Sequence, residues 1–293
     1  MARTAIVGPG AIGSVVAAWL NHTDRHEVIL CARRPRGELR VETPGGLLAS
    51  RPAVLTHPTQ GTPCDWVLAC TKTYDAGGAA LWFGGLVTPR TRVAVLQNGV
   101  EHRARFAECL PADQVVPVMV DIRSERSADG LVRQRGPGQM VVPDDAAGRA
   151  FVALFAGTPL DVTVTDDFTS TIWRKLCVNA AGILNALLLQ PAGVFRQEAV
   201  AEAARAIVRE CITVGRAEGA VLDDSLPDSV VQGYRNAPPD SVNSIQADRA
   251  AGRPMEVDAR NGVIVRLGRK HGIPTPCNQM AVALLEALTR PQG

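Results

Sequence analysis

Five short apolar runs in the first half of the chain most constrain its fold. They read TAIVG, EVILCA, DWVLACT, RVAVLQN and VVPVMV, and turn residues bound each of them. Continuous apolar runs of this length are typical of strands buried on both faces of a parallel sheet. The segment AIGSVVAAWLNHT between the first two has the composition of an apolar helix. This alternation predicts a Rossmann-type α/β domain, in which GQMVVP and DVTVTDD form further strands suited to a sheet edge.

The sequence changes character after Asp167. Three long segments there have helical patterns: TSTIWRKLCVNAAGILNALLL, QEAVAEAARAIVRECITVGRAEG and PMEVDARNGVIVRLGRKHG. We expect Asp167, Thr169 or Ser170 to cap the first of these helices. Pro254 should lie in the first turn of the third helix, and Gly272 should end it. The second half is therefore predicted to be all-α, and a cleft between two such halves is a common place for a substrate to meet a cofactor.

Composition excludes several classes of partner. The 293-residue chain has a net charge of +2 and only 4% aromatic residues, which argues against binding nucleic acid. Its seven cysteines are scattered without a C-x-x-C pair, so reduced thiols are predicted rather than a disulfide framework or a metal site. The uncharged run 176–195 contains Asn, Gln, Gly and Pro, which predicts a buried core helix rather than a membrane span. No secretory leader precedes the first predicted strand, so we expect a cytoplasmic protein.

Three glycines directly after the first predicted strand have the spacing G-x-G-x-x-G. Gly8 would make the tight turn, Gly10 would let the backbone approach a pyrophosphate, and Gly13 would allow close packing of helix on sheet. The N-terminus of the helix that follows offers N–H groups to phosphates, and Pro9 is tolerable because that position need not donate a hydrogen bond. The alternative is a glycine-rich turn without a ligand. The motif alone is weak, but its strand–helix setting favours a dinucleotide site.

The end of the second predicted strand indicates which dinucleotide. NAD sites usually place Asp or Glu there, to accept a hydrogen bond from the ribose 2′-hydroxyl. This strand ends VILCARR, with no carboxylate, and Arg33 and Arg34 would attract a 2′-phosphate. NADPH is therefore the predicted cofactor, unless the two arginines are only solvated surface groups.

A lysine is the best candidate for the acid–base group of a dehydrogenase. We place His22, His26, His57 and His102 in surface turns or polar helix ends and His271 at a helix terminus, where none is informative.

Lys175 lies inside the apolar segment TIWRKLCVNAAG, where desolvation of the ammonium lowers a lysine pKa toward neutrality. Asn179 is four residues on and shares its helix face, so it can orient a substrate beside Lys175. Lys175 could equally extend from a core helix to solvent.

Two further polar patches accompany Lys175. The first is Gln97, Asn98 and Gly99, at the carboxyl end of the fourth predicted strand, the edge at which open α/β sheets bind ligands. The second surrounds a predicted helix break at 252–254 and comprises Ser244, Asp248, Glu256 and Asn261. Each residue alone is a candidate cap or surface group, and the value of the patches lies in their combination.

The combination resembles the ketopantoate reductase family (2-dehydropantoate 2-reductases). The resemblance rests on GPGAIG, CTKTYD, LQNGVE, WRKLCVNA, SIQADRAAGRPMEVDARNG and the tail GRKHGIPTPCN, in the expected order and at similar spacing over almost the whole chain. It implies NADPH-dependent reduction of 2-dehydropantoate to (R)-pantoate in pantothenate biosynthesis. Together with the change in character after Asp167, it predicts residues 1–167 as the dinucleotide-binding domain and 168–293 as the helical domain for substrate binding and dimerisation.

The resemblance also implies roles for individual residues. The cofactor would be held by the loop and three further side chains: Gly8, Pro9, Gly10, Ala11, Ile12, Gly13, Arg33, Lys72 and Asn98. Lys175 matches the catalytic lysine, which would protonate the C2 oxygen. Glu256 matches the acidic residue that family members use on the substrate, where it would hold the C4 hydroxyl. Asn98, Asn179 and Ser244 match substrate-binding positions, and the serine suits the carboxylate.

One departure from the family pattern concerns the substrate. The family commonly has a second asparagine four residues after the position of Asn179, where this chain has Ile183. Asn185 lies about 120° away from Asn179 around an ideal helix and cannot replace it. A different 2-oxo acid substrate therefore stays open.

Other readings of the chain also stay open. A non-catalytic NADPH sensor is one of them. A β-hydroxyacid dehydrogenase is disfavoured because TIWRKL lacks the glycines expected before its lysine. The apolar helices of the second half suggest a homodimer.

Overall fold

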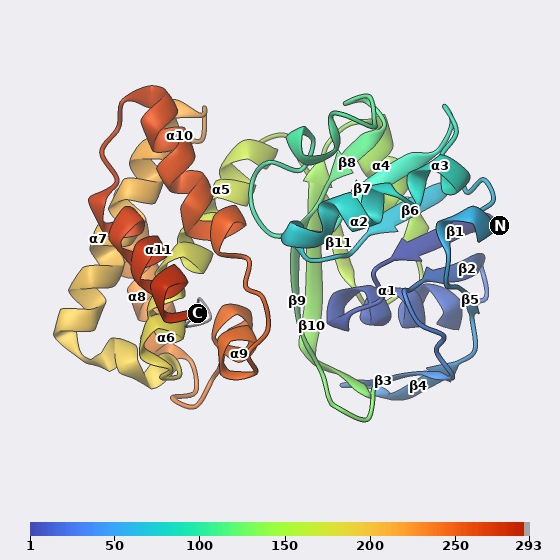
Figure 1. Ribbon diagram of the computed structural model, residues 1–293, viewed down its shortest axis with the longest axis horizontal. Helices are drawn as coiled ribbons and strands as arrows, with labels where there is room; N and C mark the ends of the chain where they lie inside the picture. The colour runs from blue at the N-terminus through green and yellow to red at the C-terminus, as the bar shows by residue number, and fades with distance from the viewer. Residues whose placement is uncertain (290–293) are drawn as a thin grey trace. The chain divides into compact units, whose positions relative to one another are not determined.

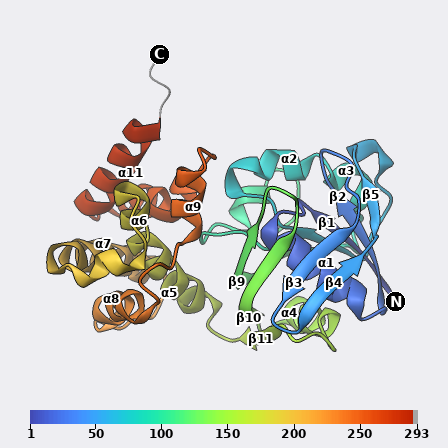
Figure 2. The same cartoon turned by 90° about the horizontal axis from the view of Figure 1, so that it is seen from below.

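The structure, a computed structural model, describes residues 1–289 and divides into two compact units. The α/β unit comprises residues 1–97 and 101–168, and the helical unit comprises residues 98–100 together with the chain from Thr169 onward. Figures 1 and 2 show the strands and short helices of the first unit and the longer helices of the second. The predicted fold class, a Rossmann-type α/β domain followed by an all-α domain, is confirmed.

A six-stranded parallel sheet forms the centre of the α/β unit. Its strand order is β5-β2-β1-β6-β7-β8, so the order reverses beside β1, which is flanked by β2 and β6. The strands are β1 (Ala2–Val7), β2 (His26–Cys31), β5 (Ala53–Leu55), β6 (Trp66–Ala69), β7 (Arg92–Val95) and β8 (Val115–Pro117). Most residues of the central strands are buried, which explains why they are continuous apolar runs in the sequence.

A second sheet in the same unit was not foreseen. Its order is β11-β10-β3-β4, and β9 pairs with β10. The strands are β3 (Leu39–Thr43), β4 (Gly46–Ser50), β9 (Met119–Arg126), β10 (Val132–Pro143) and β11 (Asp161–Thr165). The run VVPVMV, predicted as one strand, is divided at Val118: its first part is β8 of the parallel sheet and its second part begins β9. The last strand, β11, lies at an edge as expected.

Helices pack on both faces of the parallel sheet. On one face, α1 (Ala11–His22) and α4 (Ala146–Leu154) share a continuous apolar core with side chains of both sheets. On the other face, α2 (Ala76–Ala80) and α3 (Phe83–Leu86) pack with β6, β7 and Phe106. Three short 3₁₀ turns complete the unit: η1 (Pro58–Gln60), η2 (Thr73–Asp75) and η3 (Ala104–Phe106).

The described residues of the helical unit contain no strand. The elements are α5 (Phe168–Ala181), α6 (Ile183–Leu188), η4 (Ala192–Arg196), α7 (Glu198–Ala217), α8 (Leu226–Asn236), α9 (Ser244–Ala250), η5 (Asp258–Gly262), α10 (Val263–His271) and α11 (Pro276–Thr289). The element η5 is a π-helical turn at the start of α10. In the described chain, no helix combines the length and apolar character needed to cross a membrane.

The first predicted helix of this unit is interrupted at Gly182, where α5 gives way to α6. The Tyr234 hydroxyl donates to Val178 O at 3.1 Å, and Asn243 Nδ2 donates to Gly182 O at 3.0 Å. A Cβ on Gly182 would lie 2.6 Å from the tyrosine oxygen, so glycine is needed for this approach. Two side chains distant in sequence therefore bind carbonyl groups near the interruption.

Some of the predicted helix ends agree with the structure and others do not. Because α5 begins at Phe168, Thr169 and Ser170 lie inside the helix, and Ser170 Oγ instead accepts from Val221 N at 2.7 Å. The placement of Pro254 in a helical turn was wrong, because residues 253–256 are irregular and helical structure begins at Val257. The predicted end at Gly272 is confirmed: it caps α10 with φ +67°.

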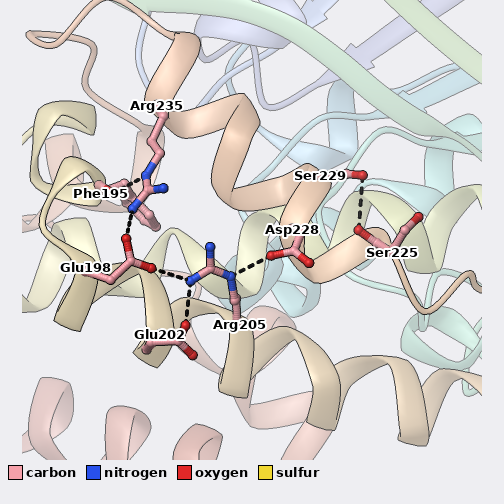
Figure 3. Close-up of polar contacts among 8 residues, drawn as sticks. All are labelled: Phe195, Glu198, Glu202, Arg205, Ser225, Asp228, Ser229 and Arg235. Carbon is pink, nitrogen blue, oxygen red and sulfur yellow. Dashed lines mark hydrogen bonds and ion pairs between the residues drawn. The ribbon is translucent and has the colours of Figure 1, made fainter.

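A network of charged side chains joins α7 to α8 (Figure 3). Arg205 Nε on α7 donates to Asp228 Oδ1 on α8 at 2.7 Å, while its Nη1 donates to Glu198 and Glu202 at 2.8 Å each. Arg235 on α8 donates to Phe195 O at 2.9 Å. A network of this kind fixes the pairing of two helices more firmly than a single exposed ion pair would.

Asn278 should be among the most sensitive polar residues of the helical unit. It is fully buried; its Nδ2 donates to Ile207 O and Glu210, and its Oδ1 accepts from Asn261 Nδ2. We expect Asn278→Ala to lower the free energy of unfolding by about 1–3 kcal/mol, because buried partners lose their hydrogen bonds. Urea denaturation measures this, with the exposed Asn236→Ala as control, and equal stability of the two variants would contradict the prediction.

Candidate functional site

The glycine loop lies where the order of the parallel sheet reverses. Gly8 N donates to Cys31 O at 3.1 Å and Cys70 N donates to Val7 O at 2.8 Å, so the loop starts between the ends of β2 and β6. Gly8 has φ +81°, and a Cβ there would lie 2.5 Å from Thr71 Cγ2. A Cβ on Gly13 would lie 2.7 Å from Gly8 O. Both positions therefore require glycine for tight packing of loop and helix on the sheet.

The N-terminus of α1 is open on the side of this loop. Gly10 precedes the helix, and a Cβ on it would meet no atom closer than 4.0 Å. The first turn, Ala11 to Ser14, contains no acidic residue, and the Ser14 hydroxyl donates to Pro9 O instead of capping the helix. Backbone N–H groups at a helix start lack helical acceptors and attract anions. The residues present therefore fit the pyrophosphate of a dinucleotide.

Two basic residues follow the neighbouring strands. Arg33 comes after β2; its side chain is 87% exposed, and its Nη1 lies 3.7 Å from Asp75 Oδ2. Arg34 beside it is also exposed. Lys72 follows β6, is half-buried and directly precedes η2. Because β2 and β6 flank β1, the parallel sheet brings Arg33, Lys72 and Gly8 to the same edge.

A chain of side-chain hydrogen bonds lies in the helical unit. Arg260 Nη2 donates to Asn179 Oδ1 at 2.9 Å, and Asn179 Nδ2 donates to Asn98 Oδ1 at 3.4 Å. Asn98 Nδ2 donates in turn to Glu256 Oε2 at 2.9 Å. We call these four residues the polar cluster. Three of them were predicted site residues from distant parts of the sequence, and the fold brings them together.

The other predicted residues lie near or apart from the polar cluster. Lys175 is half-buried on α5, one helical turn before Asn179. Ser244 is exposed at the first residue of α9, whose N-cap is Asn243. Within residues 1–289 no hydrogen bond joins Ser244 to the polar cluster. Lys175 therefore shares a helix face with Asn179 of the polar cluster.

The position of the missing asparagine is apolar and closed. Ile183 is fully buried in α6. Asn185 is also buried, and its Nδ2 donates to Gln190 O at 2.9 Å while its Oδ1 accepts from Asn243 Nδ2. The side chain of Asn185 is thus engaged with the loop after α6 rather than with Asn179.

Sequence reasoning missed Arg260 and misplaced two histidines, because His26 begins strand β2 and has buried ring nitrogens. Arg260 is four residues after Glu256 in a segment that was read as an ordinary helix, and this spacing was the only signal available. His102 was expected at the surface but is buried, with its Nε2 2.9 Å from Gln97 O. Burial lowers the pKa of His102 to about 4, so the ring is neutral near pH 7.

Most of the cysteines are wholly or partly buried. All seven cysteines are free, and Cys31, Cys64, Cys177 and Cys211 are buried. Burial raises the pKa of Cys31 to about 12, far from the range of a reactive thiolate. No two cysteines are joined in a disulfide.

Two family models match the chain. Residues 4–146 match the model described as ketopantoate reductase PanE/ApbA, and residues 167–289 match ketopantoate reductase PanE/ApbA C terminal. A 2-dehydropantoate 2-reductase of Caulobacter vibrioides is 54% identical over 287 residues, covering 98% of this chain and 99% of the relative.

Solved structures share the whole fold. A PanE/ApbA family ketopantoate reductase from Ralstonia eutropha JMP134 has a TM-score of 0.89 at 31% identity, and the match covers 98% of each chain. A dimeric ketopantoate reductase from Staphylococcus aureus has a TM-score of 0.88 at 24% identity, covering 99% of this chain and 100% of that one.

Proposed function

The chain belongs to the ketopantoate reductase family, a family of oxidoreductases, and from this premise we propose that it reduces 2-dehydropantoate to (R)-pantoate with NADPH, a step of pantothenate biosynthesis. The observation that carries the proposal is the polar cluster with Lys175 one helical turn away. A 2-oxo acid bearing a hydroxyl needs a proton donor for its C2 oxygen, donors for its other oxygens and an acceptor for the hydroxyl. Lys175, the two asparagines and Glu256 supply these groups.

Lys175 is the proposed general acid. When bound, NADPH supplies a hydride to C2. The oxygen then gains the electron pair of the C=O bond, and the Lys175 ammonium gives it a proton, so that a hydroxyl forms. A cation beside a developing alkoxide is worth most in a partly desolvated site, and Lys175 is half-buried on an apolar helix.

The amides and Glu256 would orient the substrate. Asn98 and Asn179 each donate an amide hydrogen within the chain of hydrogen bonds, and the same two amides are proposed to bind substrate oxygens. Glu256, which is 6% exposed, is proposed to accept a hydrogen bond from the C4 hydroxyl of the substrate. Ser244, exposed at the start of α9, is proposed to bind the carboxylate.

Ile183 favours a second candidate, the reduction of another 2-oxo acid. An apolar side chain stands where the family commonly has an amide, which removes one polar contact to the pantoate skeleton. The deciding experiment is a spectrophotometric assay of NADPH oxidation with 2-dehydropantoate and a panel of branched 2-oxo acids. Turnover of 2-dehydropantoate with the highest kcat/KM supports the first proposal, and a higher value for another acid would correct the substrate. No turnover of any acid would leave a non-catalytic NADPH sensor.

Removal of the Lys175 ammonium should abolish most of the activity. We expect Lys175→Ala to lower kcat by roughly two to four orders of magnitude, because the transition state loses its proton donor. NADPH affinity, followed by fluorescence titration, should stay unchanged. Lys270→Ala is the matched control, because Lys270 is an exposed lysine that pairs with Glu218. Retained turnover in Lys175→Ala would remove the lysine from its proposed role.

Arg33 should discriminate between the two nicotinamide dinucleotides. We propose that its exposed guanidinium binds the 2′-phosphate, since no carboxylate follows β2 at positions 33 and 34. Arg33→Ala should weaken NADPH binding by about 10- to 100-fold while changing NADH binding little. Isothermal titration with both dinucleotides measures the ratio, with Arg90→Ala as control, because Arg90 is exposed just before the start of β7. An equal loss for both cofactors would contradict this assignment.

A homodimer is proposed through an apolar groove of the helical unit. The groove has a volume of about 570 Å³ and is formed by α6, α7 and α11, with Leu184, Leu187, Leu188, Val200, Leu284 and Leu288 among its lining residues. Leu188, Leu284 and Leu288 are exposed, and leaving them in water is unfavourable. The dimeric S. aureus reductase shares the fold. A second copy of this chain is the proposed occupant.

Sedimentation velocity tests the dimer at micromolar concentration. Leu284→Glu should shift the protein from dimer to monomer, because a buried, unpaired carboxylate opposes association. Leu81→Glu is the matched control, since Leu81 is also exposed but lies in the α/β unit. A monomeric wild type, or dissociation by both variants, would contradict the proposed interface.

A further inference from the structure

Arg260 is a buried cation with hydrogen-bonding capacity left over. Its residue surface is 3% exposed, and only its Nη2 makes a hydrogen bond, to Asn179 Oδ1 at 2.9 Å. Its Nε and Nη1 are buried and have no hydrogen-bond partner in the described chain. Burial of unpaired charged donors is unfavourable for folding. The buried guanidinium of Arg260 therefore does not contribute to the stability of the fold in an obvious way, which indicates a role in function.

The backbone holds Arg260 in a π-helical turn. The turn η5 runs from Asp258 to Gly262, immediately after Glu256. Its neighbour Asn261 donates through Nδ2 to Ala180 O at 3.1 Å and to Asn278 Oδ1 at 2.9 Å. These bonds anchor the turn against α5 and α11, so the arginine side chain meets α5 from a fixed backbone. Single π-helical turns are frequent at functional sites.

The two ends of the polar cluster determine which way its amides face. Arginine can only donate hydrogen bonds, so Asn179 must present Oδ1 to Arg260. Asn179 Nδ2 then faces Asn98 Oδ1, and Asn98 Nδ2 faces the Glu256 carboxylate, which can only accept. An amide that loses such a partner can rotate and exchange its oxygen for its nitrogen. Arg260 therefore fixes the orientation of Asn179 and, through it, supports that of Asn98.

The charges near the polar cluster also indicate a role for Arg260. Asp248 is buried and pairs with Arg253 at 2.9 Å. Glu256 and an anionic 2-oxo acid would bring two negative charges, whereas Lys175 alone brings one positive charge. The carboxylates of Glu256 and Asp248 are near enough to act against the burial that lowers the pKa of Arg260. The guanidinium would supply the second positive charge.

We propose that Arg260 is a positioning residue for the substrate: it fixes the donor direction of Asn179 and Asn98 and balances the charge of a carboxylate substrate beside Glu256. The inference rests on the proposed function. Arg260 acts through Asn179 and does not touch the reacting atoms. Its contribution is to recognition of the 2-oxo acid, and the dinucleotide site in the α/β unit does not depend on it.

The test compares Arg260→Met and Arg260→Lys in steady-state assays with 2-dehydropantoate and NADPH. Methionine fills similar space without charge or donors, and KM for the oxo acid should rise by about 10- to 100-fold, as for a lost hydrogen bond to a charged group. The decrease in kcat should be smaller than this rise, and KM for NADPH should stay within about twofold of wild type. Lysine keeps the charge but lacks the planar fork, so its KM should lie between those of wild type and Arg260→Met.

A structural arginine of the same unit provides the control. Arg235→Met removes donors to Phe195 O and Glu198, so it should lower Tm and leave KM for the oxo acid unchanged. A KM within twofold of wild type in Arg260→Met, or a loss shared equally between the oxo acid and NADPH, would overturn the inference while the wild type stays active. If Arg260→Met does not fold, the same comparison is made with Arg260→Lys: a raised KM for the oxo acid with an unchanged KM for NADPH supports the inference, and an unchanged KM for the oxo acid overturns it. A wild type that turns over no 2-oxo acid would overturn the proposed function and this inference with it.

Discussion

The close approach of Gly8 to Thr71 is the constraint on which the α/β unit depends. The loop after β1 crosses the end of β6 so tightly that a single Cβ would lie 2.5 Å from a threonine methyl. Gly13 then sits against Gly8 O, which brings the first turn of α1 onto the sheet. Once α1 is held there, Val15, Val16 and Leu20 join the core shared by both sheets. The loop that is suited to a phosphate and the core that stabilises the unit thus arise from the same two glycines.

The parallel sheet could be predicted because its information is local. Every strand except β5 contains a continuous apolar run typical of burial on both faces. The three-residue edge strand β5 has no buried residue and was not predicted. The second sheet could not be predicted in the same way, because its pairings join distant segments: Val41 of β3 pairs with Val132 of β10. β3 alternates between buried and exposed residues, and Val118 separates two strands of different sheets within one apolar run. The second sheet is determined by pairing between distant segments, which cannot be recognised in a single sequence.

The candidate site divides in the same way between local and distant information. Lys175 and Asn179 share a helix face by spacing alone, and Glu256 follows a break that glycine and proline mark in the sequence. The break at Gly182 depends on Tyr234 and Asn243, which no local pattern announces. Arg260 was missed for a related reason. An arginine in a helical pattern is usually solvated, and only tertiary packing reveals that this one is buried.

Two consecutive residues of the π-helical turn serve stability and recognition separately. Asn261 Nδ2 donates to two buried acceptors, and these bonds tie the turn to α5 and α11. Arg260 next to it makes one hydrogen bond and leaves two buried nitrogens unpartnered. Because Asn261 anchors the turn, the backbone stays in place even though the buried charge of Arg260 is unfavourable for folding. If the site accepts an anion next to Glu256, as proposed, Arg260 can carry the compensating charge because the turn does not depend on that side chain for its anchoring.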